Sequence, residues 1–217
     1  MPVKVGLRYI EIWKDDLEPV VCRYEQEQQA AGQIVFYGPS YFTRWSEQYG
    51  MIPMREVLRG ASGAPCVVNR GFGSSCSEHQ LYYYPRMIRP LAPKVLVYSS
   101  VGNGLAFGYT LEEIWELAQR VIAYARVDFP DIRICLCGSQ YHRKDTPADE
   151  EQYRLYDSWL KEFAERTPNC RYINVMDYEP LREDSIFVDD GVHFNQEGYH
   201  RYAEFFREAL KEELARF

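Results

Sequence analysis

The sequence predicts an α/β protein with a doubly wound parallel sheet of about five strands and helices on both faces. Two observations predict it. Short apolar runs recur along the chain, and amphipathic helical segments lie between them. Continuous apolar runs are typical of strands buried on both faces. Their alternation with helices predicts right-handed crossovers, and ligands in such sheets bind beyond the carboxyl ends of the strands.

The expected strands and helices can be placed along the chain. Thr110 and Glu113 form a capping box, Thr146 precedes a proline at a first helical position, and a last helix is expected to begin near Asn195. Residues 18–31 also have a helical pattern. Residues 3–12 could form a strand or an arm, so 1–16 is treated as a possible N-terminal arm or extra strand of one domain over 1–217. The expected strands cover residues 33–37, 65–68, 94–98, 132–137 and, more weakly, 171–175.

Composition excludes some classes of function. The net charge is −7 at 217 residues, and no cluster of basic residues could neutralise the phosphates of a nucleic acid. The same charge argues against an anionic membrane surface. No apolar stretch could span a bilayer or serve as a signal peptide, so a cytoplasmic location is expected. The six cysteines lie in or beside apolar runs and are expected to be free thiols. The sequence leaves the oligomeric state open.

Three segments at the ends of expected strands carry candidate chemistry. The first ends a strand and reads IVFYGPS; its serine, Ser40, lies where a helix begins. A serine at such a turn exposes its hydroxyl at the rim of the sheet, although serine after Gly-Pro is also an ordinary turn residue. The second reads NRGFGSS. Its glycines allow the backbone to approach a ligand and bind an anion through N–H groups; a plain connecting loop is the alternative.

The third segment reads DDGVHFN and places Asp190 three residues before His193. A histidine that accepts a proton from a hydroxyl needs an acceptor on its second ring nitrogen, and Asp190 can provide it. Asp190 could otherwise only close the turn. In combination, the three segments indicate nucleophilic catalysis by a serine.

These segments, in this order and across about residues 17–210, resemble the SGNH (GDSL-like) hydrolases, and the NRGFG segment resembles their acetylhydrolase-like branch. The resemblance implies a flavodoxin-like SGNH hydrolase fold. It implies that Ser40 is the nucleophile, His193 the general base and Asp190 its orienting partner. The oxyanion hole would be formed by Ser40, by Gly73 or Ser74 in the second segment, and by Asn103 in VLVYSSVGNG. The chain departs from the family pattern at three positions, which are Pro39, Ser74 and Gly104.

Other candidates are weaker. His142 and Arg143 follow the fourth expected strand and could bind substrate oxygens, although such loop residues are often only solvated. His79 and His200 are expected on helix surfaces. No ligand spacing supports a metal site, and no cofactor is expected.

The sequence therefore predicts a serine esterase for short-chain acyl esters, with a small-molecule or carbohydrate ester as its substrate and O-acetyl as the acyl group that the resemblance favours. The alternative is a catalytically silent SGNH-fold protein that binds a ligand, which the substitutions at Pro39 and Gly104 would favour.

Overall fold

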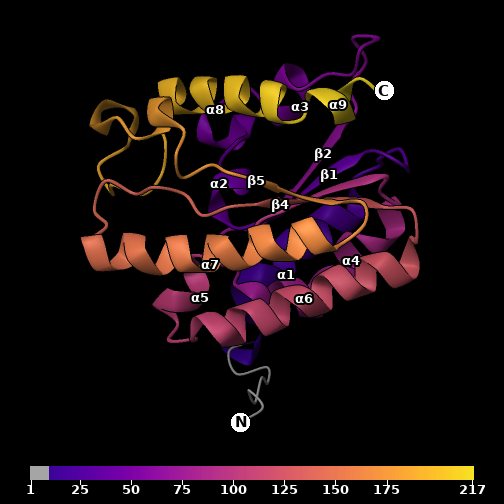
Figure 1. Ribbon diagram of the computed structural model, residues 1–217. Coiled ribbons are helices and arrows are strands. Elements are labelled where there is room, and N and C mark those ends of the chain that lie inside the picture. Colours follow the sequence, from indigo (N-terminus) through magenta and orange to yellow (C-terminus); the bar gives the residue numbers. More distant parts are fainter. Residues whose placement is uncertain (1–9) are drawn as a thin grey trace.

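The computed structural model describes the backbone of residues 10–217 and the side chains of residues 13–217. Its centre is an all-parallel sheet with the strand order β2-β1-β3-β4-β5 (Figure 1). This is the order of flavodoxin-like doubly wound sheets, so the predicted fold class is confirmed. The strands are β1 (Ile34–Gly38), β2 (Val67–Gly71), β3 (Val95–Tyr98), β4 (Arg133–Cys137) and β5 (Cys170–Ile173).

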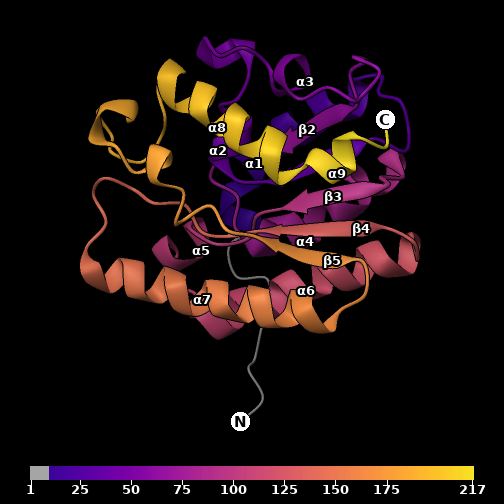
Figure 2. The same ribbon diagram turned by 45° about the horizontal axis from the view of Figure 1, so that its top comes forward.

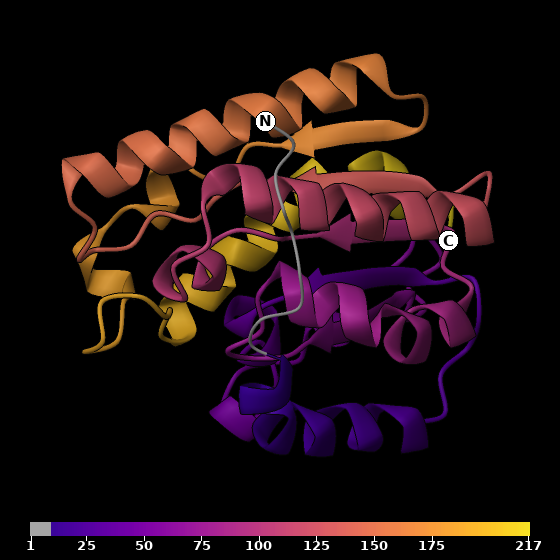
Figure 3. The same cartoon turned by 90° about the horizontal axis from the view of Figure 1, so that it is seen from below.

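Helices cover both faces of the sheet. In Figure 1 the sheet is seen between α8 with α9 above it and α6 with α7 below it. The view from below shows that α1, α4, α6 and α7 cross their face side by side in that order, from indigo to orange (Figure 3). The helices are α1 (Ile10–Gln26), α2 (Ser40–Thr43), α3 (Met54–Val57), α4 (Ser77–Met87), α5 (Asn103–Ala106), α6 (Leu111–Asp128), α7 (Pro147–Arg166), α8 (Gln196–Ala209) and α9 (Lys211–Leu214).

Two hydrophobic cores result, one on each face. Alternate residues of each strand point to opposite faces, so Val35 and Tyr37 of β1 pack against α1, α4, α6 and α7. Their neighbours Ile34 and Phe36 pack against α2, α3, α8 and α9. Burial on both faces explains why the strands are apolar throughout.

The carboxyl ends of the strands meet at one edge of the molecule. In Figure 2 the arrowheads of β3, β4 and β5 point the same way, towards α5. The register places the last residue of β1, Gly38, beside Gly71 at the end of β2. The connections that follow β1, β2, β3 and β4 therefore begin at this edge, where the candidate residues lie.

The predicted helix starts at Thr110, Thr146 and Asn195 are confirmed. Each side chain accepts a backbone N–H from three residues further on, at 3.0 to 3.3 Å. The expectation that residues 1–16 form an arm or an extra strand is wrong for residues 10–16, which begin α1. Residues 1–9 lie outside the described residues. The first helix thus begins before residue 18, and Pro19 lies within it.

Two further expectations can be compared with the structure. All six cysteines are free, as predicted. Burial raises the pKa of the Cys76 and Cys170 thiols to about 11.

His200 is exposed, but the surface position expected for His79 is wrong, because its side chain is fully buried. Its Nδ1 accepts the Cys76 N–H at 3.1 Å, which caps the inward-facing start of α4. In the part of the chain that the structure describes, no helix is long and apolar enough to cross a membrane.

Candidate active site

Ser40 is the first residue of α2, directly beyond β1. Pro39 is the N-cap of this helix, and its carbonyl accepts the N–H groups of Phe42 and Thr43 at 3.1 and 3.4 Å. Proline suits this position because the N–H of an N-cap residue takes no part in the helix. Gly71 allows the helix to lie against β2, since a Cβ there would be 2.4 Å from the backbone nitrogen of Thr43. The local sequence therefore fixes Ser40 at the carboxyl end of β1.

Asp190 and His193 lie in a tight loop before α8. The loop is closed by the Val188 N–H, which donates to the His193 carbonyl at 2.9 Å. Between the two residues, Gly191 has a φ of +66°, in the left-handed region that favours glycine. The turn brings the aspartate side chain back onto the histidine.

A continuous chain of hydrogen bonds joins the three residues. The Ser40 Oγ lies 2.8 Å from His193 Nε2, and His193 Nδ1 lies 2.7 Å from Asp190 Oδ2. Asp190 Oδ1 accepts the backbone N–H groups of Val192 and His193, both at 2.8 Å. This is the arrangement that activation of a serine hydroxyl by a neutral imidazole requires.

Tyr41 holds the two halves of this site together. Its hydroxyl donates to the Val192 carbonyl, and its own carbonyl accepts the Tyr199 hydroxyl at 2.9 Å. Its ring centroid lies 5.7 Å from that of His193. The residue next to Ser40 thus fixes the loop of His193 relative to α2.

The protonation states follow from these contacts. Burial lowers the pKa of His193; the hydrogen bond to Asp190 opposes this shift, and the charge of Arg44 adds to it. Burial raises the pKa of Asp190, but the hydrogen bonds from His193 and Val192 outweigh burial and hold the pKa of this carboxyl well below its usual range. At neutral pH, His193 is therefore neutral and Asp190 ionised.

This assignment predicts the pH dependence of turnover. If His193 acts as a general base, its imidazole must be neutral, and its lowered pKa moves its deprotonation to more acidic solution. We expect kcat/KM for p-nitrophenyl acetate to rise with pH along an acid limb with its midpoint below about 6.5, the pKa of a free imidazole. Initial rates measured between about pH 4 and 8 at an isosbestic wavelength test this expectation. A midpoint above about 7 would contradict it.

Hydrogen-bond donors surround Ser40. A Cβ added to Gly73 would lie 3.7 Å from the Ser40 Cβ, so the second segment passes beside the serine. Among the described residues, the backbone N–H groups of Ser40, Gly73 and Ser74 have no hydrogen-bond partner. Ser74 has a φ of +63°, a strained conformation for a residue other than glycine. Free N–H groups beside a serine hydroxyl can stabilise an oxyanion that develops on a bound carbonyl group.

Asn103 begins α5 and lines the same pocket as Ser40. One of its amide hydrogens is donated to the Ser75 carbonyl at 2.9 Å, which fixes the side chain and leaves the second hydrogen for a ligand. The structure also explains the substitution at Gly104, because a Cβ there would lie 2.8 Å from Cδ1 of Ile114. No larger residue fits next to Asn103 without moving Ile114.

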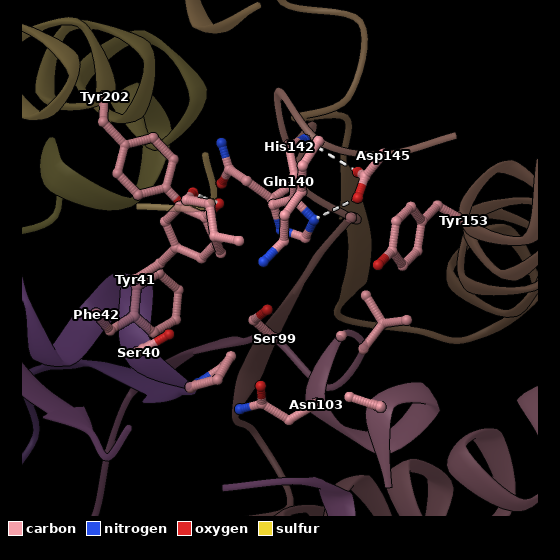
Figure 4. A pocket seen from close by; sticks show the side chains of 17 residues that line it. Ser40, Tyr41, Phe42, Ser99, Asn103, Gln140, His142, Asp145, Tyr153 and Tyr202 are labelled. Atoms are coloured by element: carbon pink, nitrogen blue, oxygen red, sulfur yellow. Dashed lines mark hydrogen bonds and ion pairs between the residues drawn. The ribbon is translucent and has the colours of Figure 1, made fainter. Parts of the chain in front are cut away.

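The pocket has a volume of about 210 Å³. In Figure 4, Ser40 and Asn103 lie at its lower side, and His142 with Asp145 lies across from them. His142, predicted to contact substrate, thus lines the pocket. Arg143 does not: its guanidinium donates instead to the carbonyls of Val188 and Asp189 at 3.4 Å.

Sequence reasoning missed several residues of this site. Gln140 and Asp145 line the pocket, and Arg44 approaches Asp190 Oδ2 at 3.5 Å. Asp145 had a detectable signal, because its spacing from His142 is that of Asp190 from His193 in reverse. Arg44 and Gln140 carry no such local signal, since only the fold brings them to the site.

Comparison with known proteins identifies the family of the chain. Residues 36–201 match the family model of the GDSL-like Lipase/Acylhydrolase family. The chain therefore belongs to this family of hydrolases. No curated protein sequence matched the chain.

Solved structures of low sequence identity share the fold. A Bacteroides fragilis protein provisionally described as an acylhydrolase is 16% identical, with a TM-score of 0.71 over 92% of this chain and 97% of that one. An acetyl xylan esterase is 17% identical, with a TM-score of 0.68 over 82% and 99%. A variant of an acetyl-xylooligosaccharide esterase from Geobacillus is 14% identical, with a TM-score of 0.65 over 82% and 94%.

Proposed function

We propose that this chain is a single-domain serine esterase that hydrolyses short-chain acyl esters, O-acetyl esters of carbohydrates above all, through an acyl-serine intermediate. The observation that carries the proposal is the hydrogen-bond chain from Ser40, which lines the pocket, through His193 to Asp190, with free N–H donors beside the serine.

In the first half of the reaction, Ser40 Oγ attacks the ester carbonyl carbon while its proton passes to His193 Nε2. Negative charge moves to the carbonyl oxygen, where the N–H groups of Ser40 and Gly73 or Ser74 and the amide of Asn103 receive it. Collapse of the resulting tetrahedral intermediate breaks the bond between the acyl carbon and the alcohol oxygen, and this oxygen takes the proton from His193. The acyl group remains on Ser40.

In the second half, water replaces the alcohol. His193 Nε2 removes a proton from the water as its oxygen attacks the acyl carbon, and the same donors hold the oxyanion. Collapse releases the carboxylic acid and returns the proton to Ser40 Oγ. Asp190 stays ionised throughout and stabilises the imidazolium that forms twice in each turnover.

The pocket must receive the acyl group and the adjoining atoms of the alcohol, so its size supports a short acyl group. A volume of about 210 Å³ lies below the roughly 300–1,000 Å³ of pockets that hold drug-sized ligands. Two of the structural neighbours are esterases of acetylated xylan or xylooligosaccharide, which supports acetyl esters of carbohydrates as the substrate class.

The proposal predicts both turnover and acyl-chain preference. We expect hydrolysis of p-nitrophenyl acetate, with kcat/KM exceeding that for p-nitrophenyl octanoate by at least roughly tenfold, because the small pocket excludes the long chain. Steady-state rates of both esters, with Ser40→Ala as the control for background hydrolysis, test this.

The outcomes separate the candidate functions. Equal rates for the two esters would contradict the short-chain preference and leave the esterase assignment standing. Turnover no faster than that of Ser40→Ala at any pH would contradict the esterase and indicate a protein that only binds its ligand.

A further inference from the structure

A second histidine–carboxylate pair lines the pocket, across from Ser40 (Figure 4). His142 Nδ1 lies 3.0 Å from Asp145 Oδ1, and the His142 backbone N–H donates to Asp145 Oδ2 at 3.0 Å. The Asp145 N–H returns a bond to the His142 carbonyl at 3.0 Å. Both side chains are largely buried, with 12% and 7% of their surface exposed. The proposed hydrolytic steps use neither of them.

The imidazole of His142 has a fixed orientation. Its ring lies parallel to that of Tyr41, with centroids 5.9 Å apart and an angle of 3° between the planes. The ring of Tyr153 meets it at 90° from 5.8 Å. With Nδ1 held by Asp145, a ring packed in this way cannot turn without losing its contacts. The pair is therefore preorganised.

The remaining ring nitrogen is available to a ligand. In the neutral tautomer that has its hydrogen on Nδ1, facing the Asp145 carboxylate at 3.0 Å, Nε2 carries a lone pair. Among the described residues, Nε2 of His142 has no hydrogen-bond partner, in contrast to Nε2 of His193, which is paired with Ser40. An acceptor of this kind pairs with a hydroxyl group.

A neighbouring side chain points to the same kind of ligand. Gln140 lines the pocket, and its Nε2 is buried without a hydrogen-bond partner. Buried donors are rarely left unpaired. The acceptor of His142, with the unpaired amide of Gln140 beside it, suits a molecule with several hydroxyl groups better than an apolar alcohol.

We propose that the His142–Asp145 pair recognises a hydroxyl group of the alcohol part of the ester, with His142 as the binding residue and Asp145 as its positioning residue. This inference rests on the proposed esterase function. A short acyl group such as acetyl has no hydroxyl, so the recognised group belongs to the alcohol, and the pair selects esters of polyhydroxylated alcohols such as sugars.

The test compares two esters that differ only in hydroxyl groups, a mono-acetylated methyl xyloside and its dideoxy analogue. We expect the wild-type protein to favour the xyloside in kcat/KM by about tenfold, as expected for one hydrogen bond. His142→Phe keeps an aromatic ring between Tyr41 and Tyr153 but lacks the acceptor, and should abolish this preference. Its kcat/KM for p-nitrophenyl acetate, which has no hydroxyl group, should fall much less than its kcat/KM for the xyloside.

Two further variants sharpen the result. His200→Phe makes the same change at an exposed histidine of α8 and should keep the full preference for the xyloside. Asp145→Asn retains one acceptor for His142 and should lose part of the preference. If circular dichroism shows that His142→Phe is unfolded, Asp145→Asn provides the test instead. A loss of stability alone does not change the ratio of kcat/KM between the xyloside and its dideoxy analogue.

The outcomes distinguish this inference from the proposed function. If the wild type hydrolyses p-nitrophenyl acetate and His142→Phe keeps the wild-type preference, the inference is overturned and the esterase stands. If no ester is hydrolysed, calorimetric titration with the acetylated xyloside tests the inference by comparing Ser40→Ala with the same variant that also carries His142→Phe. Binding to Ser40→Ala that the second substitution weakens about tenfold supports recognition by His142. No binding, or binding that the substitution leaves unchanged, overturns it.

Discussion

Asp190→Asn is expected to lower kcat/KM for p-nitrophenyl acetate by roughly 10³–10⁴. The asparagine oxygen can still accept the backbone N–H groups of Val192 and His193, which now bond to Oδ1 at 2.8 Å. Its NH₂ group then takes the place of Oδ2, opposite His193 Nδ1. His193 Nδ1 must then accept a hydrogen bond, so the ring hydrogen moves to Nε2. In this tautomer, Nε2 can no longer take the proton of Ser40.

The same substitution should slow labelling of Ser40 by a fluorophosphonate in parallel with turnover, because both reactions need the deprotonated serine. Asp189→Asn is the matched control. Asp189 is the adjacent aspartate of the loop, and no side-chain contact of its carboxylate is seen among the described residues, so this variant should behave as wild type. Near-full activity of Asp190→Asn would show that Asp190 only closes the turn.

Asn103→Ala is expected to lower kcat by roughly 10²–10³ with little change in KM. The amide of Asn103 is held by the Ser75 carbonyl at 2.9 Å, and its second hydrogen is left for a ligand in the pocket that Asn103 lines. A bond to the carbonyl oxygen strengthens as that oxygen becomes charged, and its loss therefore affects the transition state more than the bound ester.

Steady-state kinetics of Asn103→Ala beside Asp190→Asn distinguishes the two roles. Fluorophosphonate labelling should persist in the alanine variant at a reduced rate, since His193 still activates Ser40. Full activity of Asn103→Ala would mean that the backbone N–H groups of Ser40, Gly73 and Ser74 suffice, and that Asn103 only anchors α5 to the loop of Ser75.

The sequence predicted the sheet well because its strands are buried on both faces and are apolar throughout. The strand at the edge shows where this signal weakens. The expected strand ends at residue 68 because Asn69 and Arg70 are polar, but β2 extends to Gly71. Arg70 is nonetheless buried, paired with Glu27 at 2.8 Å and placed over the ring of Tyr24. Such compensation depends on a helix distant in the sequence and leaves no local pattern.

The candidate site was predictable where its geometry is local. The Asp190–His193 contact spans one turn, and Ser40 marks the junction of a strand and a helix, so both have sequence signals. The contact between Ser40 and His193 joins segments 153 residues apart; only the order of the motifs indicated it. The error at His79 has a similar cause, since a helical position does not reveal which side of the helix faces the core.

The most direct test of the proposed activity is to treat the purified protein with a fluorophosphonate and map the adduct by mass spectrometry. A phosphonylated Ser40 on the intact chain, absent from Ser40→Ala and slowed in Asp190→Asn, is the predicted result. The other hydroxyl groups at this edge, such as that of Ser99, have no histidine partner among the described residues and should stay unmodified. An adduct on another serine, or none while p-nitrophenyl acetate is hydrolysed, would contradict the assignment of Ser40 as the nucleophile.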